Sequence, residues 1–371
     1  MKTAAIITFI NNYNFGSTLQ AYALKRAIED LGWQAYHLNY APSKLEKLKN
    51  LLLSGNSPKL ILEGILRRRG WDSEKNLAFD FFQDTYLDKT DPLSSHAQLA
   101  KATNRADRLI CGSDQIFSPV WLNPAYFGVF TDKPKGAYAP SFGVREIPDA
   151  KAKRMKPWLK AFDFLSCREA NGAKLIKEIT GKDCPVACDP VCLLTGDEWR
   201  ELAQPFDWPR PYLLCYLLGD REDYPVLVEQ YAREKGLEPL IIPVTTDSRL
   251  WNCQRLDGLG PQEFLSAVAG ADYILTDSFH MTAFAALLER PCTPLRREPK
   301  GSAESKHGRI KHFLRTTGLD PEDPDWETVR PNLEKMRQEG LRLLKKALGE
   351  KFDPTVYTTY LEEKCKEIYH L

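Results

Sequence analysis

A short polar sequence near residue 280 has residue types that can bind an anion and transfer a proton. The apolar run Ala271–Thr276 is typical of a buried strand, and Asp277-Ser278 leads directly from it into an apolar helix. Asp277 or Ser278 can cap that helix, and a helix N-terminus favours a bound anion. His280 lies in the first turn, where a side chain that titrates near neutrality can face a substrate. From the residues alone, a surface or capping role for His280 explains the pattern equally well.

The segment that follows this helix is strongly basic. Residues 290–315 contain eight Lys and Arg against two Glu, whereas the whole chain has 51 basic and 50 acidic residues. A solvated face or a nucleic-acid patch is one explanation, but neither overall basicity nor interleaved aromatic residues support nucleic-acid binding. A pocket for a multiply charged small anion explains the excess better, because it follows Ser278 and His280 so closely. The basic residues are Arg290, Arg296, Arg297, Lys300, Lys306, Arg309, Lys311 and Arg315.

Two further polar residues follow predicted strands in the first half of the chain. Asp114 lies in the loop Cys111–Gln115, and Arg168 stands just after Phe164–Ser166. Ligands of parallel α/β sheets bind beyond the carboxyl ends of the strands, so both residues are candidates for a site. An arginine at the end of a strand is more often a salt-bridge partner than a ligand contact.

Several catalytic motifs do not occur in the chain. It has no G-x-G-x-x-G fingerprint, P-loop, G-x-S-x-G elbow or H-E-x-x-H sequence, which argues against dinucleotide oxidoreductases, NTPases, serine hydrolases and zincins. Cys184, Cys188 and Cys192 are spaced four apart, but Pro185 and Pro190 interrupt the helix that would align them as metal ligands. We expect reduced thiols and no metal.

The elements that must position these residues alternate between strand and helix. This alternation predicts an α/β protein whose parallel sheets carry helices on both faces. Prolines between residues 190 and 211 interrupt the pattern, which then restarts. We therefore predict two Rossmann-like domains, residues 1–195 and 196–350, that face each other across a cleft. The predicted strands are Ala4–Ile10, Ala35–Asn39, Arg108–Cys111, Gly136–Ala139, Phe164–Ser166, Tyr212–Leu218, Pro239–Val244, Ala271–Thr276 and Cys292–Leu295, and the helices Ser17–Leu31, Ala170–Thr180, Asp223–Lys235, Pro261–Ala269 and Phe279–Glu289.

Two segments stand outside this alternation. Residues 41–95 are a predicted helical insertion, in which residues 60–69 form a basic amphipathic helix. It either contacts a membrane-bound acceptor lipid or, as we favour, covers the cleft or packs on the sheet. Within residues 351–371, a helix over Thr355–Tyr369 is expected to return to the first domain. No apolar run approaches the roughly 18 residues of a membrane span, and the N-terminal run is too short for a signal peptide. We expect a cytoplasmic protein, in contact at most with the inner face of the membrane.

Four sequence blocks together resemble the polysaccharide pyruvyl transferase family. No single block is decisive, but their joint order is specific, and they cover most of residues 4–317. The blocks are the Asn-rich opening from Asn12 to Leu24; Gly112-Ser113-Asp114-Gln115-Ile116-Phe117 with Tyr138-Ala139-Pro140-Ser141-Phe142-Gly143; Ser166-Cys167-Arg168-Glu169-Ala170 through Asp189-Pro190; and Thr276-Asp277-Ser278-Phe279-His280.

The resemblance implies a fold like that of the GT-B glycosyltransferases, with the active site in the cleft. It implies phosphoenolpyruvate as the donor, a glycan or lipid-linked oligosaccharide as the acceptor, a pyruvate ketal as the product, and no cofactor. The family's arginine matches Arg168 and its histidine matches His280. Its lysine matches Lys300 in one branch of the family, and the pattern of another branch fits Lys306 and Arg309. Met281 departs from the pattern, since glycine is common there, and so does Phe15-Gly16-Ser17 in place of Tyr-Gly-Ala.

These matches predict a role for each residue. Arg168 binds the donor carboxylate, and Ser278 with Lys300, Lys306 and Arg309 binds the phosphate. His280 is the general acid, Asp114 orients or deprotonates the acceptor hydroxyl, and Asn14 and Gln115 line the acceptor side of the cleft. Two other functions stay open: a glycosyltransferase that uses a nucleotide sugar, and a non-catalytic carbohydrate-binding protein.

Overall fold

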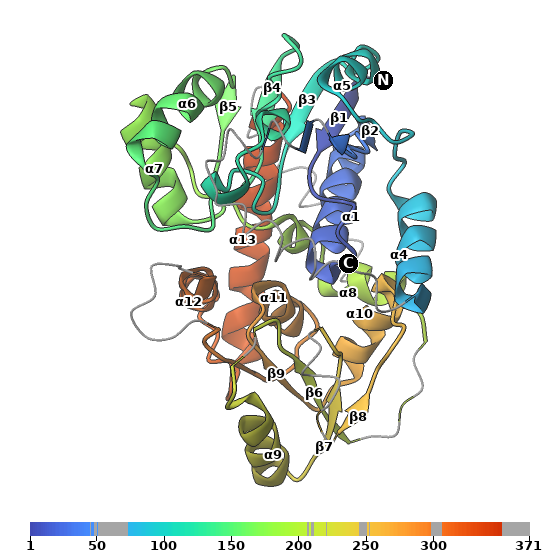
Figure 1. Ribbon diagram of the computed structural model, residues 1–371. Helices are drawn as coiled ribbons and strands as arrows, with labels where there is room; N and C mark the ends of the chain where they lie inside the picture. The colour runs from blue at the N-terminus through green and yellow to red at the C-terminus, as the bar shows by residue number, and fades with distance from the viewer. Residues whose placement is uncertain are drawn as a thin grey trace, which may run out of the picture.

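The computed structural model describes residues 1–44, 46–47, 50, 73–205, 208, 211–219, 221–244, 251, 253–297 and 306–350. They form two five-stranded parallel sheets, one above the other in Figure 1. The predicted amphipathic helix at 60–69, Lys300 and the predicted helix at 355–369 lie outside the described residues. No described helix is long and apolar enough to cross a membrane.

The first sheet is built from short strands that are buried almost throughout. Its strand order is β2-β1-β3-β4-β5, and Ala5 of the inner strand β1 pairs with Tyr36 of β2 and Leu109 of β3. Such burial is typical of parallel sheets that are covered on both faces. The strands are β1 (Thr3–Ile7), β2 (Gln34–His37), β3 (Arg108–Cys111), β4 (Lys135–Ala137) and β5 (Phe164–Leu165), and the helices that follow them are α1 (Phe15–Asp30), α4 (Ser73–Tyr86), α5 (His96–Thr103), α6 (Asp149–Lys160) and α7 (Ala170–Thr180).

The second sheet repeats this design with the strand order β10-β9-β6-β7-β8. Its central strands β6 and β9 are fully buried. The strands are β6 (Tyr212–Tyr216), β7 (Glu238–Ile241), β8 (Gln254–Arg255), β9 (Tyr273–Thr276) and β10 (Cys292–Pro294), and the helices are α8 (Gly196–Leu202), α9 (Tyr224–Lys235), α10 (Pro261–Gly270), α11 (Phe279–Leu287), α12 (Lys306–Thr317) and α13 (Trp326–Ala347).

A shared apolar core joins the two sheets. Phe15 at the start of α1 stacks on Phe264 of α10, with ring centroids 4.3 Å apart and an angle of 11° between the ring planes. Phe79 of α4 packs on the same Phe15 ring. Helix α1 follows strand β1 of the first sheet, whereas α10 lies between strands β8 and β9 of the second sheet. This contact therefore fixes the N-terminus of α1 against the second half of the chain.

Helix α13 extends from the second sheet to the first, as Figure 1 shows. It contacts α12 as well as β4 and β5. Near its end, Gly136 of β4 lies so close to the backbone of Ala347 that a Cβ at position 136 would come within 2.3 Å of the Ala347 oxygen. The Arg108 guanidinium donates a hydrogen bond to that oxygen, which suits the negative end of a helix dipole. The chain therefore returns to the first sheet before residue 351.

Candidate active site

Two helix N-termini meet at the centre of the molecule. The Asn14 side chain accepts a hydrogen bond from the Ser17 amide at 3.1 Å, so α1 begins at Phe15 rather than at Ser17 as predicted. The Ser278 hydroxyl accepts from the Met281 amide at 3.4 Å and caps α11. Both polar side chains that we predicted for ligand contact therefore serve as caps.

Gly16 lets these two helix ends come into contact. A Cβ at position 16 would lie 2.1 Å from Nδ1 of His280, which is closer than two such atoms can approach. The imidazole therefore rests directly on the backbone of α1. This glycine fixes where the ring of His280 lies relative to the first sheet.

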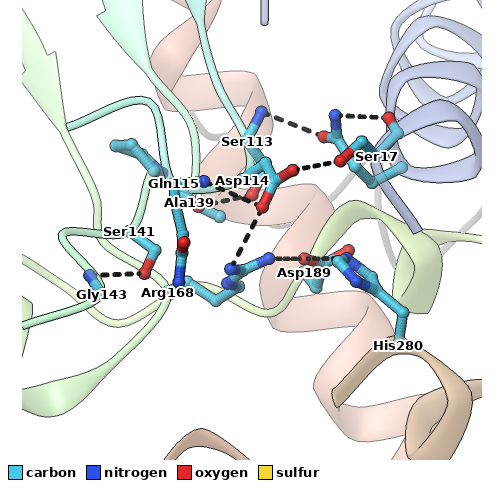
Figure 2. A network of polar contacts seen from close by, with 12 residues as sticks. Ser17, Ser113, Asp114, Gln115, Ala139, Ser141, Gly143, Arg168, Asp189 and His280 are labelled. Carbon is cyan, nitrogen blue, oxygen red and sulfur yellow. Dashed lines mark hydrogen bonds and ion pairs between the residues drawn. The ribbon is translucent and has the colours of Figure 1, made fainter. Parts of the chain in front are cut away.

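A buried carboxylate links Arg168 to His280. Arg168 follows β5 and is 4% exposed, and its Nη1 donates to Oδ2 of Asp189. The Nε2 atom of His280 lies 3.4 Å from the same Asp189 oxygen (Figure 2). The other Asp189 oxygen accepts from the Val191 amide at 3.1 Å. Burial raises the pKa of Asp189, but the adjacent His280 and Arg168 outweigh that effect and hold it well below its usual value. Asp189 is therefore ionised.

Asp114 extends this network along the first sheet. It follows β3 with a φ angle of 65°, and its Oδ2 accepts from the Ser17 hydroxyl at 2.6 Å. Its Oδ1 lies 3.7 Å from Nη2 of Arg168, as Figure 2 shows. Gln115 next to it packs against Gly143. The structure thus brings together Asp114, Arg168 and His280, with Asp189 between the last two.

Arg309 of α12 joins the cluster through the ring of Phe279. The Cζ atom of Arg168 lies 5.2 Å from the centre of this ring, and the Cζ atom of Arg309 lies 5.9 Å from it. Guanidinium groups are attracted to an aromatic face. Burial lowers the pKa of Arg309 to about 10, and the charge of Arg168 contributes.

Several buried donors in this cluster have no hydrogen-bond partner among the described residues. They are Nε and Nη2 of Arg168, Nε2 of His280 and Nε of Arg309. Nη2 of Arg168 and Nε2 of His280 lie at ion-pair distance from Asp114 and Asp189 but form no hydrogen bond with them. An unsatisfied buried donor is costly, so these donors leave capacity to bind an anionic ligand. No group of three or more metal-ligating side chains occurs in the described part of the chain.

Comparison with known proteins gives this cluster a family context. A model of the family described as polysaccharide pyruvyl transferase matches residues 14–299. The chain belongs to the polysaccharide pyruvyl transferase family. A search of curated proteins returned no match.

Solved structures show the fold of this family member. A UDP-GlcNAc 2-epimerase from Methanocaldococcus jannaschii is 13% identical with a TM-score of 0.50, and the match covers 91% of this chain and 93% of that one. A UDP-N-acetylglucosamine 2-epimerase from Rickettsia bellii is 11% identical with a TM-score of 0.48, over 100% of both chains. At such low identity the likeness concerns the fold alone. The predicted two-domain α/β fold of the GT-B kind is confirmed.

The sequence contains two aspartates whose contacts could not be predicted from the sequence. Asp277, a predicted helix cap, instead accepts from the amides of Leu218 and Gly219 at 2.7 and 2.8 Å and binds Arg297 at 3.1 Å. It therefore holds the loop after β6. Asp189 stands out in the sequence only as part of a family block. Its one signal is the Asp-Pro pair, because Asp189 follows no predicted strand.

A cavity of about 470 Å³ opens beside the cluster, between the first turn of α7 and helix α12. Glu169 and Arg309 are among its lining residues. Lys306, a predicted phosphate ligand, is the first residue of α12, and its side chain lies outside the described part of the structure.

Proposed function

We propose that this family member transfers the enolpyruvyl-derived group of phosphoenolpyruvate to two hydroxyls of a cell-surface or exopolysaccharide sugar, which forms a pyruvate ketal. The observation that carries the proposal is the group of unpartnered donors on Arg168, His280 and Arg309 around the ring of Phe279. Phosphoenolpyruvate has a carboxylate and a phosphate at a fixed separation, so it requires two cationic groups held apart.

The two guanidinium groups provide this arrangement. Arg168 uses Nη1 for Asp189, which leaves the edge formed by Nε and Nη2 for a two-point contact with the donor carboxylate. Arg309, on the same Phe279 ring, is the described candidate for the phosphate. Lys300 and Lys306 are further phosphate ligands in this proposal, and so is the N-terminus of α11 at Ser278.

The reaction needs one acid and one base. In the proposed mechanism, His280 gives a proton to the methylene carbon of the donor, and Asp189 stabilises the imidazolium before transfer. The oxygen of the first acceptor hydroxyl bonds to the neighbouring carbon, while Asp114 accepts the hydroxyl proton. A second hydroxyl then attacks the same carbon, the bond from that carbon to the phosphate oxygen breaks, and phosphate leaves. The second hydroxyl proton returns to His280, and the proton held by Asp114 passes to the departing phosphate, which restores both side chains.

Phosphate release tests the proposal. Purified protein, phosphoenolpyruvate and a candidate glycan should release inorganic phosphate only when all three are present. His280→Ala should abolish release and leave phosphoenolpyruvate binding largely intact. His96→Ala, the same change on α5 outside the cluster, is the matched control and should keep full activity. Full activity of His280→Ala would exclude His280 as the acid.

A glycosyltransferase that uses a nucleotide sugar is the second candidate. The cavity beside Arg309 is large for phosphoenolpyruvate alone, and cationic side chains bind a diphosphate equally well. Thermal stabilisation by a nucleoside diphosphate, without stabilisation by phosphoenolpyruvate, would favour this function.

A further inference from the structure

Helix α12 has two faces of opposite character. Ile310, Phe313 and Thr317 are buried, and the helix packs on α11 and α13. The other face points into the cavity beside the active-site cluster. Residues spaced three, four and seven apart share one face of a helix, and the residues of α12 with this spacing that line the cavity are Gly308, Lys311, His312 and Arg315.

The two strongly basic side chains of this cavity-lining face form no ion pair among the described residues. Lys311 and Arg315 are both exposed and stand four residues apart, a spacing at which like charges destabilise a helix. Neither forms an ion pair with any residue that the structure describes. A bound anion would remove this repulsion.

The opposite wall of the cavity adds a different chemical group. It consists of the loop at Gly143 and the first turn of α7, whose N-cap residue Glu169 makes no side-chain cap hydrogen bond. Oε1 of Glu169 accepts from the Ser141 hydroxyl at 2.9 Å and from the Phe142 amide at 3.1 Å. Its Oε2 is buried and has no partner among the described residues. The cavity therefore offers cations on one wall and a free hydrogen-bond acceptor on the other.

We infer that this cavity binds a phosphorylated sugar, with the phosphate ester against Lys311 and Arg315 of α12 and a sugar hydroxyl on Oε2 of Glu169. In the proposed reaction this ligand is the acceptor, so that assignment rests on the proposed function. The binding itself does not depend on pyruvyl transfer.

Phosphoenolpyruvate fits the cavity less well than a phosphorylated sugar. It has no hydroxyl to donate to Glu169, and its carboxylate would be repelled there. The volume of about 470 Å³ lies in the range of about 300–1,000 Å³ that is typical of sites for larger small molecules. Arg309 lines the cavity and also contacts Phe279, so it places the two ligands side by side.

Calorimetric titration without the second substrate tests this inference. Wild-type protein should bind hexose 1-phosphate at least about tenfold more tightly than the free hexose. Lys311→Gln combined with Arg315→Gln should remove about tenfold of this affinity and leave phosphoenolpyruvate affinity within about twofold. The matched control is Lys156→Gln with Lys160→Gln, which removes two exposed charges at the same spacing on α6 and should change neither affinity.

Further measurements test the contribution of Glu169 separately from that of α12. They also identify what the phosphate of the natural ligand is attached to. Glu169→Gln should weaken binding of hexose 1-phosphate but not of inorganic phosphate. Tighter binding of a hexose on a short prenyl diphosphate would assign the ligand to a lipid carrier, and tighter binding of a UDP-hexose would assign it to a nucleotide.

Two results would overturn the inference. One is equal affinity of wild-type protein for hexose and hexose 1-phosphate. The other is loss of phosphoenolpyruvate affinity in the α12 double variant as large as the loss for hexose 1-phosphate, which would make the cavity part of the donor site. Binding of hexose 1-phosphate that depends on Lys311 and Arg315, in a protein that transfers no pyruvyl group, would support the inference and refute only the proposed reaction.

Discussion

The two walls of the site differ in how their charges are balanced. On the first-sheet wall, the charge of Arg168 is buried beside the carboxylates of Asp114 and Asp189, so it already has anionic partners. On the second-sheet wall, Arg309 and the cavity face of α12 carry positive charge, and the nearest carboxylate, that of Glu169, lies on the other side of the cavity. Buried charges are tolerated when they are paired. The first wall is thus preassembled, whereas the cations of the second wall can still pair with a bound anion.

The largest effect is expected when the balance of the first wall is broken. Asp189→Asn removes the charge that lies between Arg168 and His280 with little change in shape. A buried cation then loses its partner, which typically costs about 3–5 kcal/mol, and we expect phosphate release to fall by at least about a thousandfold. Urea denaturation and initial rates measure the two effects.

The exposed ion pair of Asp183 with Lys177 supplies a control. Asp183→Asn should leave the free energy of unfolding nearly unchanged, because an exposed ion pair contributes little to stability. Near-normal activity of Asp189→Asn would show that catalysis does not need this carboxylate between Arg168 and His280.

Gly16→Ala tests the contact between the walls. The added Cβ would overlap the imidazole of His280, so the ring must move. Forcing an extra methyl group into a packed site typically costs about 1–3 kcal/mol, although alanine is otherwise the better helix residue. We expect kcat to fall by about tenfold to a hundredfold while phosphoenolpyruvate affinity changes less. An unchanged kcat would contradict the role of this backbone in placing His280.

Arg309→Gln tests whether the charge of the second wall is unpaired without ligand. The variant should be more stable than wild type but should bind phosphoenolpyruvate more weakly. Without ligand, the variant loses a cation that burial and the charge of Arg168 both disfavour, so the free energy of unfolding should rise by roughly 1 kcal/mol. Phosphoenolpyruvate affinity should fall about tenfold. Thermal unfolding with and without phosphoenolpyruvate measures both. Lower stability of the ligand-free variant would show that the charge of Arg309 is already paired in the protein without ligand.

The effect confined to the narrowest range of conditions is a loss of stability in acid. The folded-state pKa of Asp189 is depressed, so its contribution to stability is complete above its unfolded pKa of about 4. It is lost as pH falls towards the folded value, by an amount on the order of 1–2 kcal/mol. Asp189→Asn should therefore lose less stability than wild type between about pH 4 and pH 2. Parallel curves for both proteins would contradict this assignment.

The sequence predicted the fold better than it predicted the contacts within the site. Local apolar periodicity is enough to predict two parallel sheets, and the order of the family blocks indicates the GT-B-like fold. Contacts between distant segments have no local signal. The Asp189 carboxylate meets Arg168 and His280 only because two sheets pack together. Asp277 looks like a cap, yet its partners Leu218 and Gly219 belong to another strand end.

Helix α13 determines where the molecule can bend. Its end is fixed to the first sheet by Arg108, and its middle packs at Gly340 against Cys188 and Leu193, on either side of Asp189. In a rotation of one sheet against the other about this strut, points near the fulcrum travel least. The spacing between Arg168 and His280 would then be nearly conserved, while the outer end of the cavity along α12 would open widest. Such a rotation would widen the cavity for a bulky ligand while Arg168 and His280 keep their spacing.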